Sequence, residues 1–257
     1  MLDRLVDIGG CEIYMRQMGD KGPVVVLEGG IGERVDYWKA VQTGISRFAR
    51  TISYERAGNG RSRTSMQPRN IMDMADDLER LMQHTGLLPP FIIVAASYGG
   101  FITRAFASKY SAKTSGLLLV EPSHEDFFKE AAKIRSSGDW QAFMNLMNNV
   151  LKDPGALEEW RNFDMNGELA RNLGFPTEIP ITVISSSRYG EIEKILMLLK
   201  KDDIEKKIAL HGEWAHRYKN IRHIITDRCG HNVAAEKPEL VVNEILKLCR
   251  LNSGGLI

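Results

Sequence analysis

The sequence has few cysteines and lacks a long apolar run. Only three cysteines occur among its 257 residues, Cys11, Cys229 and Cys249. They are widely spaced and odd in number, so they form neither a CxxC pair nor an even disulfide framework. No apolar run approaches the roughly 20 residues that a membrane helix needs, and the charged N-terminus has no signal-peptide core. We therefore expect a cytoplasmic protein without a membrane span.

The sequence also has no large excess of positive or negative charge. Lysine and arginine total 34 against 33 acidic residues, so no net field favours a nucleic-acid or membrane partner. No His/Cys group has zinc spacing, and no GxxxxGK[ST] loop is present. Gly30-Ile31-Gly32 lacks the third glycine of a dinucleotide fingerprint. These absences predict a protein without a metal or cofactor, and they leave its oligomeric state open.

What the sequence does contain is an alternation of short apolar runs and amphipathic helices. Gly9-Gly10 separates two runs as in a β-hairpin. Strand, helix and strand then follow each other repeatedly, which predicts an α/β fold with a mostly parallel sheet and helices on both faces. The expected strands are 2–8, 11–18, 24–27, 51–54, 91–95, 117–120, 179–185 and 223–226, and the expected helices are 38–48, 71–84, 101–110 and 240–251.

Residues 124–176 break this rhythm. They contain no convincing strand, and the spacing of their aromatic and aliphatic residues predicts two to four short helices. The segment falls between two strands of the sheet, where open α/β sheets bind their ligands. We therefore expect a helical cap at 124–176 on a core domain that comprises 1–123 and 177–257.

The most informative motif is Ala95-Ala96-Ser97-Tyr98-Gly99, which is followed by Gly100. It lies between an apolar run and a helical stretch, and a serine flanked by small residues at this point is typical of a nucleophile elbow. Ala95 takes the place of the usual first glycine. The alternative interpretation is a serine in an ordinary strand-to-helix loop.

A serine hydroxyl needs a base to become a nucleophile near neutral pH. Of six histidines, His231 follows the last expected strand in a Cys-Gly-His loop, which would bring it over the strand ends near Ser97. His124 lies near the same edge and stays a second possibility. The other four are in polar contexts and are expected to be solvated: His84, His211, His216 and His223. The charged run Lys194 to Lys207 is likewise expected to be a solvated helical face.

Five motifs in order resemble the α/β-hydrolase fold along residues 5 to 250. They are the loop 27–32 (LEGGIG), the loop 54–62 (YERAGNGRS), the elbow 95–100, the run 119–126 (LVEPSHED), and 229–231 (CGH). Many members of the fold place the catalytic acid after the strand that corresponds to Ile181 to Ser185, where this chain has no carboxylate until Glu191. A subset places it where this chain has Glu121. The resemblance therefore favours Glu121, with Glu191 and Asp227 as alternatives.

The resemblance also implies an oxyanion hole. One donor would be the backbone N–H of Tyr98, the residue after the nucleophile. The second would be the N–H of Gly30, with Ile31 as the alternative. Glu28 stands where the usual histidine would be, and we expect it to orient this loop.

These residues predict a serine hydrolase in which Ser97, His231 and Glu121 form the triad. The expected substrate is a small molecule with an acyl group, and the resemblance favours a carboxylesterase that cleaves a small or medium apolar ester. Amides, thioesters and C–C bonds are alternative substrates, and a non-catalytic ligand receptor on the same fold is a further alternative. Serine at the nucleophile position disfavours dehalogenase and epoxide-hydrolase chemistry. The resemblance associates those reactions with members of the fold that have aspartate at this position.

Overall fold

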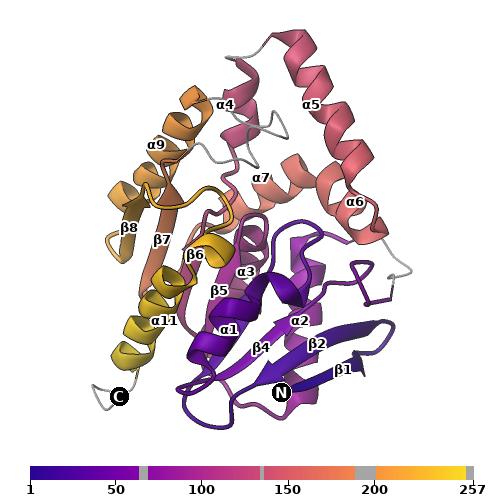
Figure 1. The fold of residues 1–257 in the computed structure, drawn as a ribbon, viewed down its shortest axis with the longest axis vertical. Helices are drawn as coiled ribbons and strands as arrows, with labels where there is room; N and C mark the ends of the chain where they lie inside the picture. Colours follow the sequence, from indigo (N-terminus) through magenta and orange to yellow (C-terminus); the bar gives the residue numbers. More distant parts are fainter. Residues whose placement is uncertain (64–68, 134–135, 189–200, 253–257) are drawn as a thin grey trace.

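The computed structural model of the protein describes residues 1–63, 69–133, 136–188 and 201–252. Its centre is an eight-stranded sheet with the strand order β1-β2-β4-β3-β5-β6-β7-β8 (Figure 1). The strands are β1 (Leu2–Asp7), β2 (Glu12–Met18), β3 (Val24–Glu28), β4 (Arg50–Tyr54), β5 (Phe91–Ala96), β6 (Thr114–Val120), β7 (Ile181–Ser186) and β8 (Ile221–Thr226).

The sheet is antiparallel at one edge and parallel elsewhere. β1 and β2 form the hairpin that the Gly9-Gly10 pair predicts, and β2 pairs antiparallel with β4. From β4 to β8 every pairing is parallel. Strands β3 and β5 are buried along their whole length, as expected for apolar runs at the centre of a parallel sheet. Their carboxyl ends meet at one edge, where the functional residues gather.

Helices cover both faces of the sheet, as predicted. α1 and α11 cross one face, while α2 and α3 lie behind the other (Figure 1). The helices that belong to the core are η1 (Val35–Trp38), α1 (Lys39–Ile45), α2 (Ile71–Thr85), α3 (Gly99–Lys109), η2 (Ser111–Lys113), α9 (Lys201–Arg217), α10 (Val233–Glu236) and α11 (Pro238–Asn252). None of the helices among the described residues is long and apolar enough to cross a membrane.

Helix α2 shows how the local sequence fixes an element. The side chain of Asn70 accepts hydrogen bonds from the first turn, and the Asp73 side chain accepts one from the Asn70 N–H, which completes a capping box. Gly86 ends the helix in the left-handed conformation, with φ 71°. Its apolar face, which includes Leu78 and Leu81, is buried against the sheet and α3.

Between β6 and β7 lies an insertion that contains only helices within its described residues, which are 124–133 and 136–176. They are α4 (Phe127–Lys133), α5 (Ser137–Val150), α6 (Pro154–Arg161) and α7 (Phe163–Leu173). In Figure 1 these helices stand above the end of the sheet where β5 and β6 finish. Their aromatic side chains form one cluster around Phe128, which packs against Phe143, Trp160 and Phe163.

Candidate active site

Ser97 lies in the tight turn that joins β5 to α3. Its backbone has φ 47°, a left-handed conformation that is rare for a residue other than glycine. The turn is held by hydrogen bonds from Ser97 N to Val120 O and from Gly100 N to Ser97 O, at 3.2 and 3.0 Å. Gly99 is required because a Cβ there would lie 2.6 Å from the Gly29 carbonyl oxygen. These features are those of a nucleophile elbow.

Glu121 lies one strand away, directly after β6, and it is also strained, with φ 49°. Its carboxylate is buried and accepts hydrogen bonds from the Ser186 N–H, from Lys207 Nζ and from His231. Burial opposes ionisation, but the positive charge of Lys207 and the bond from His231 outweigh it and lower the pKa of Glu121 to about 2. Glu121 is therefore a carboxylate throughout the neutral pH range.

His231 lies in the loop between β8 and α10. Its Nδ1 is 3.0 Å from Glu121 Oε2. Since the carboxylate can only accept, Nδ1 carries the proton and Nε2 becomes the basic atom of the neutral ring. Burial lowers the pKa of His231, but the hydrogen bond and charge of Glu121 more than compensate and raise it above the ordinary value.

The three side chains open onto one cavity of about 140 Å³. Ser97, Glu121 and His231 line it from three different loops at the carboxyl ends of the strands. Lys207 and His124 contribute polar edges. The rest of the wall is mostly apolar and comes largely from the insertion: Pro122, Phe127, Phe128, Phe143, Met147 and Phe163.

Glu121 is the carboxylate that contacts His231. Asp227 is exposed, and Glu191 lies outside the described residues. The peptide N–H of Ser186, at the end of β7, instead donates to Glu121. The segment where many members of the fold carry their acid thus supports the carboxylate of the neighbouring strand.

Lys207 and His211, both on α9, were expected to be solvated, and for both this prediction is wrong. Lys207 is buried against Glu121. His211 is also buried, and its ring nitrogens contact Ser185 Oγ and the Pro122 carbonyl oxygen at 2.7 and 2.9 Å. The sequence pattern of α9 is highly charged, so it gave no sign that one face packs under the site. Residues 194–200 of the predicted solvated run lie outside the described residues.

His124 is the remaining histidine near the site. Its ring stacks on Trp214 with centroids 4.5 Å apart, and Nδ1 accepts a hydrogen bond from the Asp126 N–H at 3.0 Å. Burial lowers its pKa to about 4, so the ring is neutral near pH 7. His124 forms part of the cavity wall and so helps to define the shape of the cavity.

The candidate oxyanion donors lie in two turns of the backbone, which we call the Tyr98 corner and the Gly30 corner. Tyr98 is the N-cap of α3, and amides at a helix start have no acceptor within the helix. The phenol of Tyr98 is buried and accepts a hydrogen bond of 2.7 Å from Asn166 of α7. The second corner, at Gly30, lies against the nucleophile, because a Cβ on Gly30 would be 3.2 Å from Ser97 Cβ.

The amide of Gly30 already has an acceptor. It donates to Glu33 Oε2 at 2.6 Å, and the Glu33 N–H donates in return to the Gly30 carbonyl at 3.2 Å. The open Gly30 donor that the sequence suggested is therefore engaged in this structure. Sequence analysis missed Glu33, although a carboxylate three residues after a glycine corner is a spacing that permits this contact.

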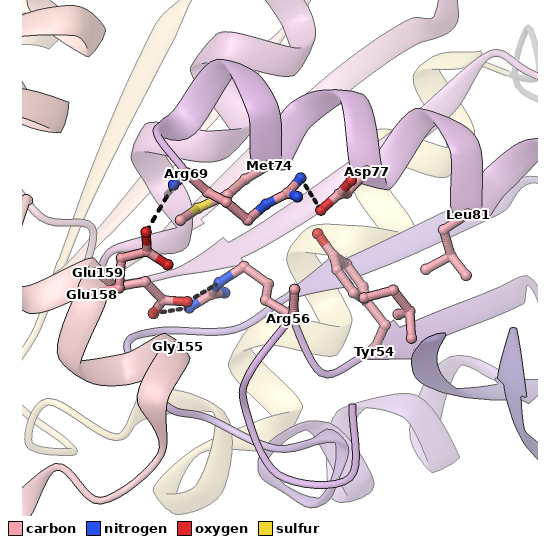
Figure 2. A pocket seen from close by; sticks show the side chains of 11 residues that line it. Tyr54, Arg56, Arg69, Met74, Asp77, Leu81, Gly155, Glu158 and Glu159 are labelled. Carbon is pink, nitrogen blue, oxygen red and sulfur yellow. Dashed lines mark hydrogen bonds and ion pairs between the residues drawn. The ribbon is translucent and has the colours of Figure 1, made fainter. Parts of the chain in front are cut away.

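The same corner contacts a buried ionic cluster, of which Figure 2 shows the pair of Arg56 and Glu159. Arg56 donates to the carbonyl oxygens of Gly29 and Gly30, both at 2.7 Å. Its remaining bonds go to Glu28, at 2.5 Å, and to Glu159 of α6, at 2.6 and 2.7 Å. The space beside this cluster is only about 10 Å³, room for one water at most. It is a packed junction between the insertion and the loop, in which Glu28 helps to hold the loop as expected.

Comparison with known proteins identifies the fold. A family model described as the alpha/beta hydrolase fold matches residues 22–147. An epoxide hydrolase mutant from Vigna radiata aligns with TM-score 0.72 and 16% identity over 97% of this chain and 98% of that one. A thermophilic esterase from Thermogutta terrifontis aligns with TM-score 0.65 and 18% identity, over 97% and 98%. The chain has the α/β-hydrolase fold.

Among curated relatives, this chain is 25% identical to an AB hydrolase superfamily protein of Gibberella zeae, over 90% of this chain and 87% of that one. It is 29% identical to the uncharacterised protein YqjL of Bacillus subtilis, over 49% of this chain and 50% of that one. The chain thus spans most of the first relative and half of the second. An esterase and an epoxide hydrolase share this fold, so the reaction has to be argued from the site.

Proposed function

We propose that this α/β hydrolase is a serine hydrolase that cleaves a small or medium apolar carboxylic ester. The observation that carries the proposal is the hydrogen bond between His231 Nδ1 and Glu121 Oε2, in a cavity that Ser97 also lines. That bond leaves Nε2 as the basic nitrogen of a ring that lines the same cavity as Ser97. A serine, a histidine in the correct tautomer and a permanently ionised carboxylate are the three parts that acyl transfer needs.

In the reaction, Ser97 Oγ attacks the ester carbonyl carbon while His231 Nε2 takes the hydroxyl proton. The tetrahedral intermediate breaks its bond to the alcohol, which leaves with the proton from His231, and an acyl-enzyme on Ser97 remains. A water molecule then repeats the sequence and releases the acid and the free serine. Glu121 stabilises the imidazolium that forms in both halves.

The oxyanion of each tetrahedral intermediate is bound by the Tyr98 N–H and by a second donor at the Gly30 corner. The positive end of α3 lies at the same place and favours the developing negative charge. Arg56 stabilises the carbonyl oxygens of that corner and thereby keeps the loop close to Ser97.

The apolar wall supports an apolar acyl or alcohol group. The cavity of about 140 Å³ is small beside the roughly 300–1,000 Å³ of sites for drug-sized ligands, which supports a short substrate. We propose that residues 124–176 act as the cap that supplies this wall, on a core of 1–123 and 177–257. The proposed reaction needs no cofactor or metal.

The proposal is tested with p-nitrophenyl esters of two to twelve acyl carbons. The wild type should hydrolyse the short members fastest, and Ser97→Ala should abolish turnover while its circular dichroism spectrum and melting temperature stay unchanged. His216→Ala, which removes an exposed histidine of α9 far along the chain from His231, is the matched control and should retain full activity. Wild-type turnover by Ser97→Ala would refute the proposal.

A further inference from the structure

Glu33 is an ionisable group at the Gly30 corner, next to the nucleophile turn, and the triad mechanism does not use it. It follows the Gly30 turn and bonds back to it in both directions, through its side chain and its own N–H. The same Gly30 is packed against Ser97. A Cβ built on it would lie 3.2 Å from Ser97 Cβ, 3.2 Å from Glu33 Cδ and 3.4 Å from Glu33 Oε1. One carboxyl oxygen therefore caps the Gly30 amide, and the other lies on the same side of the loop as the nucleophile.

A carboxylate at this place would oppose the proposed reaction. The tetrahedral intermediate carries its negative charge within hydrogen-bond distance of the Gly30 corner, and a second negative charge there would raise the barrier. A neutral carboxyl group has the opposite effect. It can accept the Gly30 N–H on one oxygen and donate its own O–H from the other, and neutral carboxylic acids can serve as oxyanion donors.

We propose that the protonated carboxyl of Glu33 is the second donor of the oxyanion hole, placed by the Gly30 amide. This inference rests on the proposed function and assigns one further catalytic residue to it. The Gly30 amide then acts through Glu33, polarising the acid and fixing its orientation. No bond to Glu33 is made or broken, since the carboxyl only donates a hydrogen bond to the oxyanion.

The surroundings favour the protonated form near neutral pH. Glu33 faces four charged or titratable groups: His231 after β8, Arg56 after β4, Glu28 at the end of β3, and Tyr37 on η1. Burial is the largest influence and raises the pKa of Glu33 to about 7, although the Gly30 bond and the charges of His231 and Arg56 act against it. The acid is therefore mostly protonated below pH 7 and ionises above it.

A specific pH dependence follows. Activity needs neutral His231, which is lost at low pH, and neutral Glu33, which is lost as pH rises through about 7. The wild-type rate should thus be bell-shaped with an alkaline limb near pH 7. A Glu33 that acted only through its negative charge would raise the pKa of His231 and so shift the acid limb, but it would not create the alkaline limb.

The experiment measures the second-order rate of fluorophosphonate labelling from pH 5 to 9.5 in the wild type, Glu33→Gln and Glu33→Ala. Gln keeps an acceptor for Gly30 and a donor for the oxyanion, but it does not titrate. Glu33→Gln should stay within about tenfold of the wild-type optimum and lose the alkaline limb. Glu33→Ala should be about 10²-fold slower or worse, the usual cost of one oxyanion donor. Glu236→Gln is the matched control, because Glu236 accepts the Gly230 N–H at 2.9 Å beside His231, and it should keep the wild-type profile.

Each other outcome overturns the inference. An alkaline limb that persists in Glu33→Gln would belong to a different group. Glu33→Ala labelling as fast as Glu33→Gln would make the freed Gly30 N–H the donor. A wild type that labels without an alkaline limb would leave Glu33 without the role, whether or not its variants fold. Failure of the wild type to label at any pH would overturn the serine-hydrolase proposal itself, and this inference with it.

Discussion

Replacement of Glu121 by glutamine removes one charge from the triad and keeps the shape of the side chain. Glu121 accepts from His231 Nδ1 at 3.0 Å, so the carboxylate and imidazolium charges lie roughly 4 Å apart. At an effective dielectric constant of about 20, such a pair interacts with about 4 kcal/mol. This interaction exists only after His231 has taken the serine proton, so its loss raises the barrier and should slow acylation by about 10³-fold.

The buried Lys207 makes this estimate a lower bound. Glutamine cannot neutralise Lys207, whose charge would then act on the imidazolium without compensation and would itself be buried without an ionic partner. Loss of one member of a buried ion pair costs about 3–5 kcal/mol of stability. The double variant Glu121→Gln/Lys207→Met removes both charges. It should be more stable than Glu121→Gln and about tenfold faster.

The assay is the rate of p-nitrophenyl butyrate hydrolysis at pH 7, with urea unfolding of each variant to show that it is folded at the assay temperature. Asp227→Asn is the control, since Asp227 is an exposed carboxylate near the same loop, and its rate should stay within about twofold. A folded Glu121→Gln that loses less than tenfold in rate would refute the reasoning. An Asp227→Asn variant that loses as much as Glu121→Gln would move the acid to Asp227.

Three further expectations follow from the packing. Glu159→Gln should destabilise the fold by about 3 kcal/mol in urea, because Arg56 loses a buried ionic partner, whereas Glu158→Gln, which alters one bond to a backbone N–H, should cost about 1 kcal/mol. Phe143→Ala should raise the ratio of kcat/KM for octanoate over acetate esters roughly tenfold by enlarging the cavity; an unchanged ratio would make Phe143 an ordinary core residue. Glu33→Gln should raise the melting temperature more at pH 8 than at pH 5, because a carboxyl whose pKa is raised to about 7 weakens the native state as pH rises from its unfolded value through 7; equal shifts at both pH values would contradict that pKa.

The sequence predicted the parts of the site that depend on local pattern and chain order. The elbow at Ser97 requires small neighbours and a strand-to-helix turn, and both are visible in the residues around it. Parallel strands that end at one edge bring Glu121 close to His231. Strand order alone left Glu191 and Asp227 as alternatives, and the choice of Glu121 came from the resemblance to the hydrolase fold. The helical insertion was visible from its aromatic spacing.

Other parts could not be predicted, because they depend on how elements pack. Lys207 is four residues from His211 on α9, and only the packing of that helix against β7 and β8 turns a charged face into a buried one. The contact of Arg56 with Glu159 joins residues 103 apart in the chain. Glu33 is different, since its partner Gly30 is three residues away. The three-residue spacing of Gly30 and Glu33 is visible in the sequence, but only the fold shows that this pair lies close to Ser97.

The central claim is that Ser97 is a nucleophile activated by His231. Its most direct test is peptide mass spectrometry of the protein after reaction with a fluorophosphonate. The account predicts one adduct per chain on Ser97, absent in Ser97→Ala and formed at least 10³-fold more slowly in His231→Ala. No adduct on the wild type, an adduct on a residue other than Ser97, or an unchanged rate in His231→Ala would contradict it.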